Sequence, residues 1–451
     1  MTTDDLAQRI AALMPRAERD LAELVAIPSV ADPRLYPPQK CREAAEWVAG
    51  AFAEAGLRDV HLEETPDGSH AVLGHRPPPP GAPTVLLYCH YDVQPPLYDE
   101  AWTSPPFVLT EREGRWYGRG AADCKGNVVM HLTALRALGD DVPVGLKFVA
   151  EGSEEQGTGG LEQFVLRNAG ELHADALVIA DTGNAAVGLP TATVTLRGLA
   201  NVLVTVDTLR GDLHSGMFGG PAPDALAALI RVLDSLRDAD GGTRVEGLDC
   251  TGSWSGVGYD EQRFRADAGV LDGVSLTGSG TVGDRLWARP AVTVLGIDCP
   301  PVVGSASAVP ATARARVSLR VPPGTDPDAA LAALTEHLTA AAPWGARLTV
   351  EPEGTGAPFR AATGGPAYTA LDEAMREVYG KPMSFLGQGG SIPLCSVLAR
   401  TYPEAEIILM GVEEPGCLIH APDESVDPGE IEHMAHVEAL FLRNYARTAR
   451  S

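Results

Sequence analysis

Three carboxylates follow one strand-like segment of the chain within five residues. Glu151, Glu154 and Glu155 come directly after Leu146–Ala150, which is typical of a buried strand. Carboxylates this close together repel one another and raise one another's pKa values unless a cation neutralises them. A solvated acidic loop is the simpler alternative, but a buried strand delivers this loop to the sheet edge where α/β proteins bind ligands. The cluster therefore predicts a cation site.

Two further candidate ligands stand at the ends of apolar segments. His90 ends Thr84–His90, and Asp181 ends Ala176–Asp181. A histidine at a strand end is most often only hydrogen-bonded, whereas a metal-ligating histidine usually donates its second N–H to a carboxylate. Asp92 follows two residues after His90 and is placed to accept that hydrogen bond. We therefore expect His90 and Asp181 to be ligands and Asp92 to orient His90.

Asp123 and His420 extend this set. Asp123 lies in Gly118–Gly126, a glycine-bracketed turn before a helical pattern, where it either caps the helix or bridges two cations through both carboxylate oxygens. His420 lies on the loop after the apolar segment Ala405–Met410. Two imidazoles and three carboxylates are the ligand set of a two-metal hydrolytic site. The five expected ligands are His90, Asp123, Glu155, Asp181 and His420.

The elements that must position these residues alternate between apolar segments and helical patterns, which predicts a doubly wound α/β fold with a mixed sheet. The middle of the chain differs, because alternating strands are mixed there with two helical patterns, Pro223–Leu236 and Asp326–Ala341. Such a pattern indicates a separate α+β domain. We predict a catalytic sheet domain formed by residues 1–192 and 361–451, with residues 193–360 inserted as the α+β domain.

Charge and cysteine content exclude several classes of function. Sixty acidic against 35 basic side chains give a net charge of −25, which repels phosphate backbones and anionic lipid, so we expect no nucleic-acid and no membrane partner. The seven cysteines are scattered without a C-x-x-C pair, which favours the reducing cytoplasm over a disulfide framework. No apolar run reaches the roughly 18 residues that cross a bilayer. We expect neither a signal peptide nor a membrane anchor.

Three other patterns do not support a separate function. Gly278–Gly283 matches G-x-G-x-x-G, but no helical pattern follows it before Pro290, so we expect a loop. Gly389–Pro393 lacks the second glycine of a nucleophile elbow. His433 and His436 lie at helical spacing and are expected on the surface or in packing.

Five motifs stand in order along the chain: His90-Tyr-Asp92-Val-Gln-Pro95, Gly118-Arg-Gly-Ala-Ala-Asp123-Cys-Lys-Gly126, Glu151-Gly-Ser-Glu154-Glu155, Asp212-Leu-His214-Ser-Gly216 and Gly389-Gly-Ser391-Ile-Pro393. Together they resemble the co-catalytic di-zinc metallopeptidases of the aminoacylase and carnosinase type. The combination of H-Y-D-V-Q-P with D-L-H-S-G is similar to the dipeptidase branch, which includes the cytosolic non-specific dipeptidases. The resemblance covers essentially the whole chain and implies a phosphorylase/hydrolase-like catalytic domain with an inserted lid and dimerisation domain.

The resemblance assigns the metal ligands. It implies that Asp123 bridges two divalent metal ions, that His90 and Asp181 complete one metal site, and that Glu155 and His420 complete the other. Mixed imidazole and carboxylate ligands suit zinc, and manganese or cobalt are the alternatives.

The resemblance also assigns the catalytic and substrate-binding residues. Glu154 is implied as the general base and Asp92 as the residue that orients a ligand. His214 is implied to act across the interface of a homodimer, where it stabilises the oxyanion. Arg320 and Ser391 are implied to contact the carboxylate of a small peptide substrate.

The predicted function is metal-dependent hydrolysis of the amide bond of dipeptides or related short N-acyl amino acids. The alternative is an N-acyl amino acid deacylase or desuccinylase of the same architecture, which shares every metal ligand. A non-catalytic, metal-stabilised binding protein would not need Glu154. One departure concerns specificity, because Gly387 and Gln388 stand where the family's dipeptidases commonly carry arginine and glutamate. Recognition of the substrate's C-terminal residue therefore stays open at this point.

Overall fold

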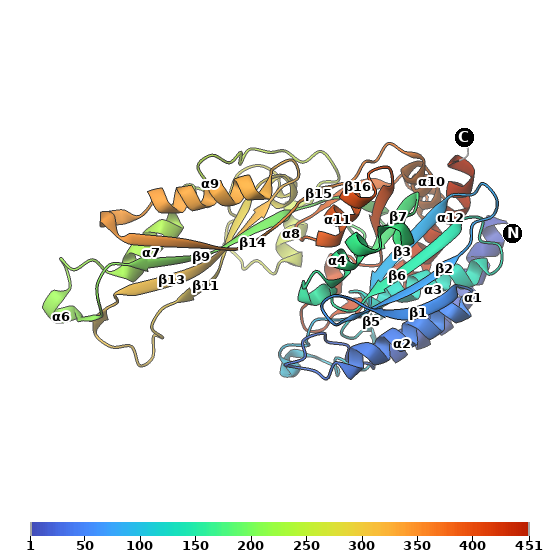
Figure 1. Ribbon diagram of the computed structural model, residues 1–451, viewed down its shortest axis with the longest axis horizontal. Coiled ribbons are helices and arrows are strands. Elements are labelled where there is room, and N and C mark those ends of the chain that lie inside the picture. Colours follow the sequence, from blue (N-terminus) through green and yellow to red (C-terminus); the bar gives the residue numbers. More distant parts are fainter. Residues whose placement is uncertain (1, 450–451) are drawn as a thin grey trace. The chain divides into compact units, whose positions relative to one another are not determined.

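The protein folds into two compact units in the computed structural model, which describes residues 2–449 (Figure 1). Unit 1 comprises the chain up to Val194, Ala361–Leu386, and the chain from Leu394 onwards. Unit 2 comprises Thr195–Arg360 together with the short segment Gly387–Pro393. That segment therefore belongs to unit 2, although unit 1 precedes and follows it in the sequence.

Unit 1 is organised around a mixed sheet, which runs β1-β2-β6-β3-β7-β17-β8. The central strands β6, β3, β7 and β17 are parallel and almost completely buried, and antiparallel strands lie at both sides. The mixed α/β sheet predicted from the sequence is confirmed. Its strands are β1 (Arg58–Glu64), β2 (His70–Arg76), β3 (Thr84–His90), β6 (Gly145–Glu151), β7 (Ala176–Ala180), β8 (Thr191–Leu196), β17 (Glu406–Met410) and β16 (Ser384–Gln388), which pairs with β8.

Helices of unit 1 pack on this sheet and on one another. Helix α3 contacts β3, α1 and α12, and nearly all of its side chains are buried, including the polar Lys125, Asn127 and His131. Helix α2 packs on β1 and β2, and its Phe52 stacks on Phe148 of β6 with ring centroids 3.7 Å apart. The helices are α1 (Thr3–Val25), α2 (Gln39–Glu54), α3 (Lys125–Leu138), α4 (Gly160–Arg167), α5 (Ala169–Leu172), α10 (Pro366–Tyr379), α11 (Pro393–Thr401) and α12 (Pro428–Thr448).

A small three-stranded sheet joins two distant parts of unit 1. Its strands are ordered β18-β5-β4, and the antiparallel β18–β5 pairing places the segment around residue 425 beside the segment around residue 117. The turn that carries Asp123 follows β5 directly, so this sheet brings the C-terminal part of the chain to that turn. The strands are β4 (Thr110–Arg112), β5 (Arg115–Tyr117) and β18 (Ser425–Val426).

Unit 2 is built on an antiparallel sheet in the order β11-β13-β9-β14. Alternate residues of β9 are buried, and this buried face packs with α7 and α9 into one hydrophobic cluster, as the period-two sequence pattern requires. Figure 1 shows both helices beside this sheet. The elements are β9 (Gly198–Asp207), β10 (Leu213–His214), α6 (Ser215–Phe218), α7 (Ala225–Asp234), α8 (Glu261–Asp267), β11 (Ala291–Asp298), β12 (Ala308–Val309), β13 (Thr312–Val321), α9 (Pro327–Ala340), β14 (Arg347–Gly356) and β15 (Phe359–Arg360).

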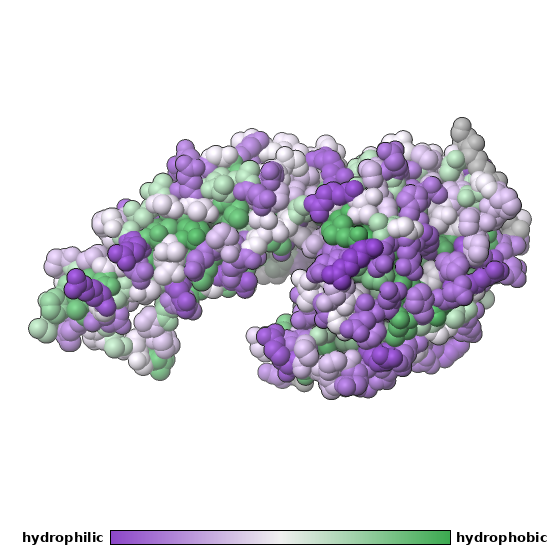
Figure 2. All heavy atoms as spheres, in the orientation of Figure 1, coloured by the Kyte–Doolittle hydropathy of each residue, from purple (hydrophilic) through white to green (hydrophobic). Residues whose placement is uncertain are grey.

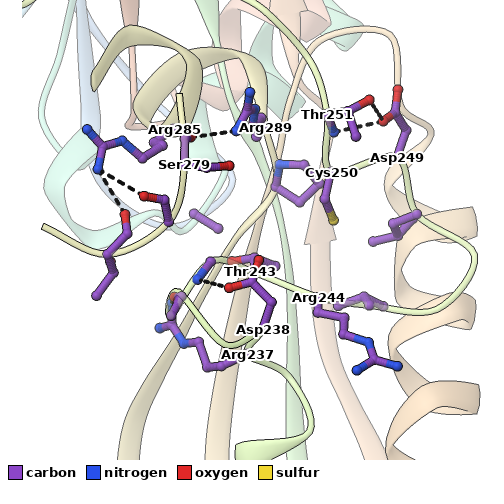
Figure 3. A pocket seen from close by; sticks show the side chains of 18 residues that line it. Arg237, Asp238, Thr243, Arg244, Asp249, Cys250, Thr251, Ser279, Arg285 and Arg289 are labelled. Atoms are coloured by element: carbon purple, nitrogen blue, oxygen red, sulfur yellow. Dashed lines mark hydrogen bonds between the residues drawn. The ribbon is translucent and has the colours of Figure 1, made fainter. Parts of the chain in front are cut away.

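The loops of unit 2 enclose a cavity of about 570 Å³ with several arginines in its wall (Figure 3). A short π-helix, Asp284–Ala288, lies next to it, so the prediction that no helix follows Gly278–Gly283 is wrong for these five residues. Local contacts stabilise this single turn. The amide of Asp284 donates to the Thr281 hydroxyl, the amide of Thr281 donates to the Asp284 carboxylate, and Trp287 is buried against Trp254. So short a turn leaves no hydrophobic periodicity in the sequence.

Part of the surface of unit 2 is apolar. Met217 and Phe218 of α6 are 75% and 46% exposed, and Figure 2 shows hydrophobic surface at the α6 end of this unit. Strand β11 lies at an edge of the sheet and exposes Val294, Leu295 and Ile297. Within residues 2–449, no helix combines the length and the apolar composition needed to cross a membrane.

Candidate metal centre

Three neighbouring parallel strands end at the candidate centre. Strand β3 lies between β6 and β7, and all three run in the same direction, so their carboxyl ends share one edge of the sheet. His90 is the last residue of β3, Asp181 directly follows β7, and the turn Glu154–Gln156 comes three residues after β6. The strand-end positions identified in the sequence are therefore adjacent in space because the strands are adjacent in the sheet.

All five expected metal ligands converge within unit 1. Nε2 of His90 lies 2.9 Å from Oδ1 of Asp123 and 3.1 Å from Oδ1 of Asp181. Nε2 of His420 lies 3.0 Å from Oδ2 of Asp123 and 3.2 Å from Oε2 of Glu155. The two oxygens of Asp123 thus face two different histidines, each accompanied by one further carboxylate. This is the arrangement expected of a carboxylate that bridges two cations.

Electrostatics at this edge are dominated by burial. Burial opposes ionisation of Asp123, but hydrogen bonds from His420 and His90 outweigh it and hold its pKa well below the usual range. Burial raises the pKa of Asp181 to about 6, in spite of the nearby His90. Burial and then the charge of Asp181 raise the pKa of Glu154, and burial and then the charge of Asp123 raise that of Glu155. The carboxylates therefore need more positive charge than the two imidazoles supply.

The donor set fits divalent metal ions. Imidazole nitrogen and carboxylate oxygen are the ligands that zinc takes in catalytic sites. Oε1 of Glu155 and Oε1 of Glu413 are buried without a hydrogen-bond partner among the described residues, as expected for oxygens that face a cation. Two groups of possible ligands share Asp123: one adds Glu155 and His420, and the other adds Asp181 and Glu413. Within each group the ligand atoms lie within 4.8 Å of one another.

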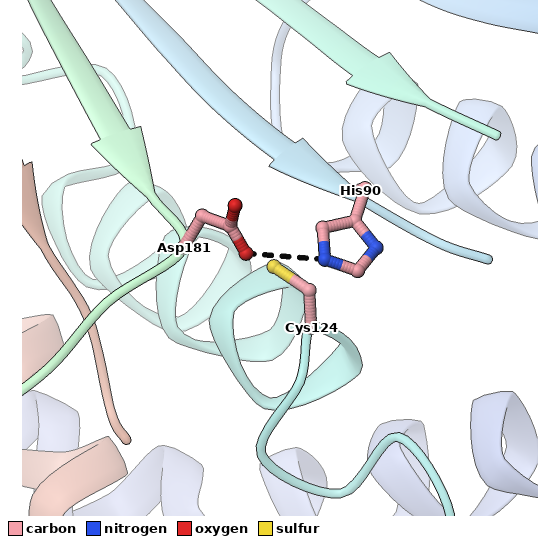
Figure 4. Close-up of side chains that lie close together, drawn as sticks. All are labelled: His90, Cys124 and Asp181. Atoms are coloured by element: carbon pink, nitrogen blue, oxygen red, sulfur yellow. Dashed lines mark hydrogen bonds and ion pairs between the residues drawn. The ribbon is translucent and has the colours of Figure 1, made fainter. Parts of the chain in front are cut away.

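Cys124 also approaches the ligands. Its Sγ lies within 4.8 Å of the ligand atoms of His90 and Asp181 (Figure 4). The thiol donates to the carbonyl of Ala180 at 3.0 Å, and burial raises its pKa to about 12. The protonated thiol is thus satisfied by the main chain.

Asp92 acts mainly on the acidic turn. Its two carboxylate oxygens accept hydrogen bonds from the main-chain amides of Glu154 and Glu155, at 3.2 and 3.0 Å. Nδ1 of His90 is hydrogen-bonded to the main-chain oxygen of Asp92 at 3.1 Å and lies 3.4 Å from its carboxylate. Gln94 donates to Oε2 of Glu155 at 2.8 Å. The H-x-D-x-Q segment therefore orients one histidine and fixes the turn that carries two glutamates.

Glu424 holds the turn that carries Asp123, a role that no local feature of the sequence indicates. Its fully buried carboxylate accepts hydrogen bonds from the amides of Gly120, Ala122 and Asp123, and from Nη1 of Arg119 at 2.6 Å. Gly120 has a positive φ of 82°, and a Cβ there would lie 2.6 Å from a Val93 methyl group. The turn is therefore fixed by tight packing and by one buried carboxylate.

Glu413 was not singled out in the sequence, although a signal was available. It follows β17 by three residues, just as Glu154 follows β6 by three residues. Its side chain is buried, and burial together with the charges of Asp123 and Asp181 raises its pKa well above the usual range. The rule that strand-end carboxylates gather at one sheet edge would have identified it.

The remaining predicted residues belong to unit 2. His214 is exposed at the start of α6, and its Nδ1 accepts a hydrogen bond from the amide of Gly216 at 3.1 Å. Arg320 donates to the hydroxyl of Ser391 at 3.1 Å. These three residues carry no contact that by itself assigns a role in catalysis.

Comparison with known proteins identifies the family. The family described as "Peptidase family M20/M25/M40" matches residues 86–444. The chain belongs to this peptidase family. The resemblance found in the sequence motifs is thereby confirmed.

Relatives within the M20 family cover nearly the whole chain. A cysteinylglycine-S-conjugate dipeptidase of Corynebacterium striatum is 45% identical over 96% of this chain and 97% of its own length. A Cys-Gly metallodipeptidase of Schizosaccharomyces pombe is 29% identical over 90% of each chain. The crystal structure of human carnosine dipeptidase 1 superposes with a TM-score of 0.84 at 25% identity and covers 99% of both chains. These members of the family are named as dipeptidases.

The Glu424 carboxylate provides a test of how the centre is held. We expect Glu424→Gln to weaken metal affinity about 10- to 100-fold, because the new amide NH₂ faces main-chain N–H donors of the Asp123 turn and Arg119 loses its counter-ion. Metal affinity is measured by competition with a chromophoric chelator, alongside thermal unfolding.

A matched control is Glu438→Gln. Glu438 is equally buried and pairs with His131 at 2.6 Å. This variant should lose stability while keeping its metal affinity. If both variants lose metal affinity to the same extent, Glu424 has only a general effect on the fold.

Proposed function

We propose that the protein is a metal-dependent dipeptidase that hydrolyses the amide bond of dipeptides or related short N-acyl amino acids. The observation that supports this proposal most directly is the position of Glu154. It is adjacent in sequence to Glu155, at a centre where two imidazoles and several buried carboxylates converge. The carboxylate of Glu154 accepts no hydrogen bond from the described residues and is left to act as a base. The dipeptidases named among the relatives support this substrate class, and the 45% identical one makes cysteinylglycine-type dipeptides the first substrates to assay.

The proposed ligands are His90, Asp123, Glu155, Asp181 and His420, which would hold two divalent ions, zinc first and manganese or cobalt as alternatives. When bound, such ions supply polarisation of the scissile carbonyl and a lowered pKa for the attacking water. Glu154 takes the proton of that water as its oxygen bonds to the carbonyl carbon, and delivers it to the leaving amine when the C–N bond breaks. Asp92 keeps Glu154 in position through the main-chain amide.

His214 is proposed to stabilise the oxyanion formed in this reaction. Because its Nδ1 accepts the amide hydrogen of Gly216, the neutral ring carries its proton on Nε2. That N–H is the donor an oxyanion requires. Arg320 and Ser391 are proposed to contact the free carboxylate of the substrate.

We also propose a homodimer in which His214 acts in the partner's active site. Strand β11 is a sheet edge, and Val294, Leu295 and Ile297 on it are 37%, 54% and 43% exposed. An apolar, unpaired edge strand favours pairing with another chain, and a second copy is the proposed occupant. All seven cysteines are free thiols, which supports the proposed cytoplasmic location.

The base assignment is tested with Glu154→Gln. The metal-loaded wild type should cleave dipeptides in preference to N-acyl amino acids, and the variant should lose about two to four orders of magnitude in kcat while retaining both metals. Steady-state kinetics on both substrate panels, with zinc, manganese or cobalt, and metal analysis of each protein provide the measurement.

The neighbouring Glu155→Gln serves as the comparison, because it removes a proposed ligand instead of the base and should lose metal. Near-normal turnover of Glu154→Gln, or loss of its metal, contradicts the base assignment. A wild type that cleaves only N-acyl amino acids would be a deacylase.

A mixed dimer tests the trans action of His214. His214→Ala and Glu154→Gln homodimers should each be nearly inactive, the first by about 100- to 1,000-fold. A heterodimer of the two combines an intact Glu154 with an intact partner His214 at one of its two centres, so about half of the wild-type activity per dimer should return. Two affinity tags purified in sequence isolate the heterodimer. A pure heterodimer without recovered activity contradicts action across the interface.

A further inference from the structure

Arg197 is a buried cation with an unsatisfied donor. It connects β8 to β9 in unit 2 and is 6% exposed. Its Nε donates to the carbonyl of Gly389 at 3.2 Å, whereas its Nη1 is buried without any hydrogen-bond partner among the described residues. A buried guanidinium normally has every N–H donor satisfied, so an unpartnered Nη1 indicates a missing acceptor.

Ser391 links Arg197 to a second cationic side chain, Arg320, through hydrogen bonds. The Ser391 hydroxyl donates to the main-chain oxygen of Arg197 and accepts a hydrogen bond from Nη1 of Arg320 at 3.1 Å. A Cβ at Gly389 would lie 2.8 Å from Nη2 of Arg197, so any larger residue there would displace this guanidinium. The segment Gly387–Pro393 and the two arginines thus form one local arrangement in unit 2.

Neither guanidinium group has a counter-ion in the described part of the chain. No carboxylate among residues 2–449, the side chain of Asp99 not being described, lies within 4.0 Å of either group. Burial and then the charge of Arg320 lower the pKa of Arg197 to about 10, and burial lowers that of Arg320. Gln388 adds no negative charge where the resembling dipeptidases commonly carry glutamate. Uncompensated buried charge is costly, and an anion would offset that cost.

Arginines elsewhere in unit 2 are satisfied in a different way. Around the cavity of Figure 3, Arg237 donates to the carbonyls of Gly241 and Val292, and Arg289 donates to those of Gly252 and Ser279. These side chains fasten loops and leave no buried N–H that requires a ligand. Arg197 therefore differs from them by its unpartnered donor.

We propose that Arg197 is a substrate-binding residue that receives the free carboxylate of the dipeptide. It is the second cation at this position, beside Arg320 and Ser391. This assignment rests on the proposed dipeptidase function. A dipeptide carries one free carboxylate, and a planar guanidinium matches its two oxygens. Arg197 thereby makes the protein prefer substrates that end in a free carboxylate over those that end in an amide.

Binding of two probes to the metal-loaded Glu154→Gln protein, which lacks the proposed base, tests this proposal without turnover. N-acetylglycine carries the carboxylate and N-acetylglycinamide lacks it. In this Glu154→Gln background the acid should bind more tightly than the amide by calorimetry, and adding Arg197→Met should weaken acid binding about 10- to 100-fold while leaving amide binding unchanged. The control Arg289→Met, which removes an arginine with comparable carbonyl contacts, should keep the wild-type preference for the acid.

Kinetics extend the test to the substrate. For a dipeptide and its C-terminal amide, Arg197→Met should raise KM for the acid only, since loss of a fold contact would affect both substrates. Should Arg197→Met not fold, Arg197→Lys replaces it, and a loss confined to acid binding supports the proposal. An unchanged preference for the acid in the folded variant overturns the assignment. If no dipeptide is cleaved, the dipeptidase function fails, and probe binding still decides whether Arg197 binds a carboxylate.

Discussion

Repulsion among buried carboxylates is the interaction on which the rest of unit 1 depends. Asp123, Glu154, Glu155, Asp181 and Glu413 gather at one sheet edge, where burial makes each negative charge costly. Two imidazoles cannot compensate five carboxylates. Two divalent cations would add four positive charges against the three carboxylates proposed as ligands. Without cations, this concentration of negative charge destabilises the fold around the sheet edge. The same charge makes the centre selective for small, highly charged ions.

The protein around this edge keeps the carboxylates from moving apart. Asp92 fixes the turn of Glu154 and Glu155 through main-chain amides, and Glu424 fixes the turn of Asp123 in the same way. Each carboxylate thus holds its turn through hydrogen bonds from main-chain amides, and Glu424 also pairs with Arg119. A rigid scaffold of this kind lowers the reorganisation required when a cation binds.

The sequence predicted the local features well and the long-range contacts poorly. Strand β3 and the position of His90 follow from an unbroken apolar segment, and neighbouring parallel strands bring the strand-end residues together without any further signal. The contact of Glu424 with the amide of Asp123 joins residues 301 positions apart, and no spacing rule encodes it. The unsatisfied donor of Arg197 is likewise visible only once the chain around Gly389 is folded beside it.

In the proposed centre, Asp123 bridges two cations. Anomalous diffraction from crystals of the zinc-loaded protein, recorded above and below the zinc absorption edge, tests this claim most directly. We predict two peaks per chain on opposite sides of Asp123, one between His90 and Asp181 and the other between Glu155 and His420. A single peak, or two peaks of which one lies away from Asp123, would contradict the two-cation centre.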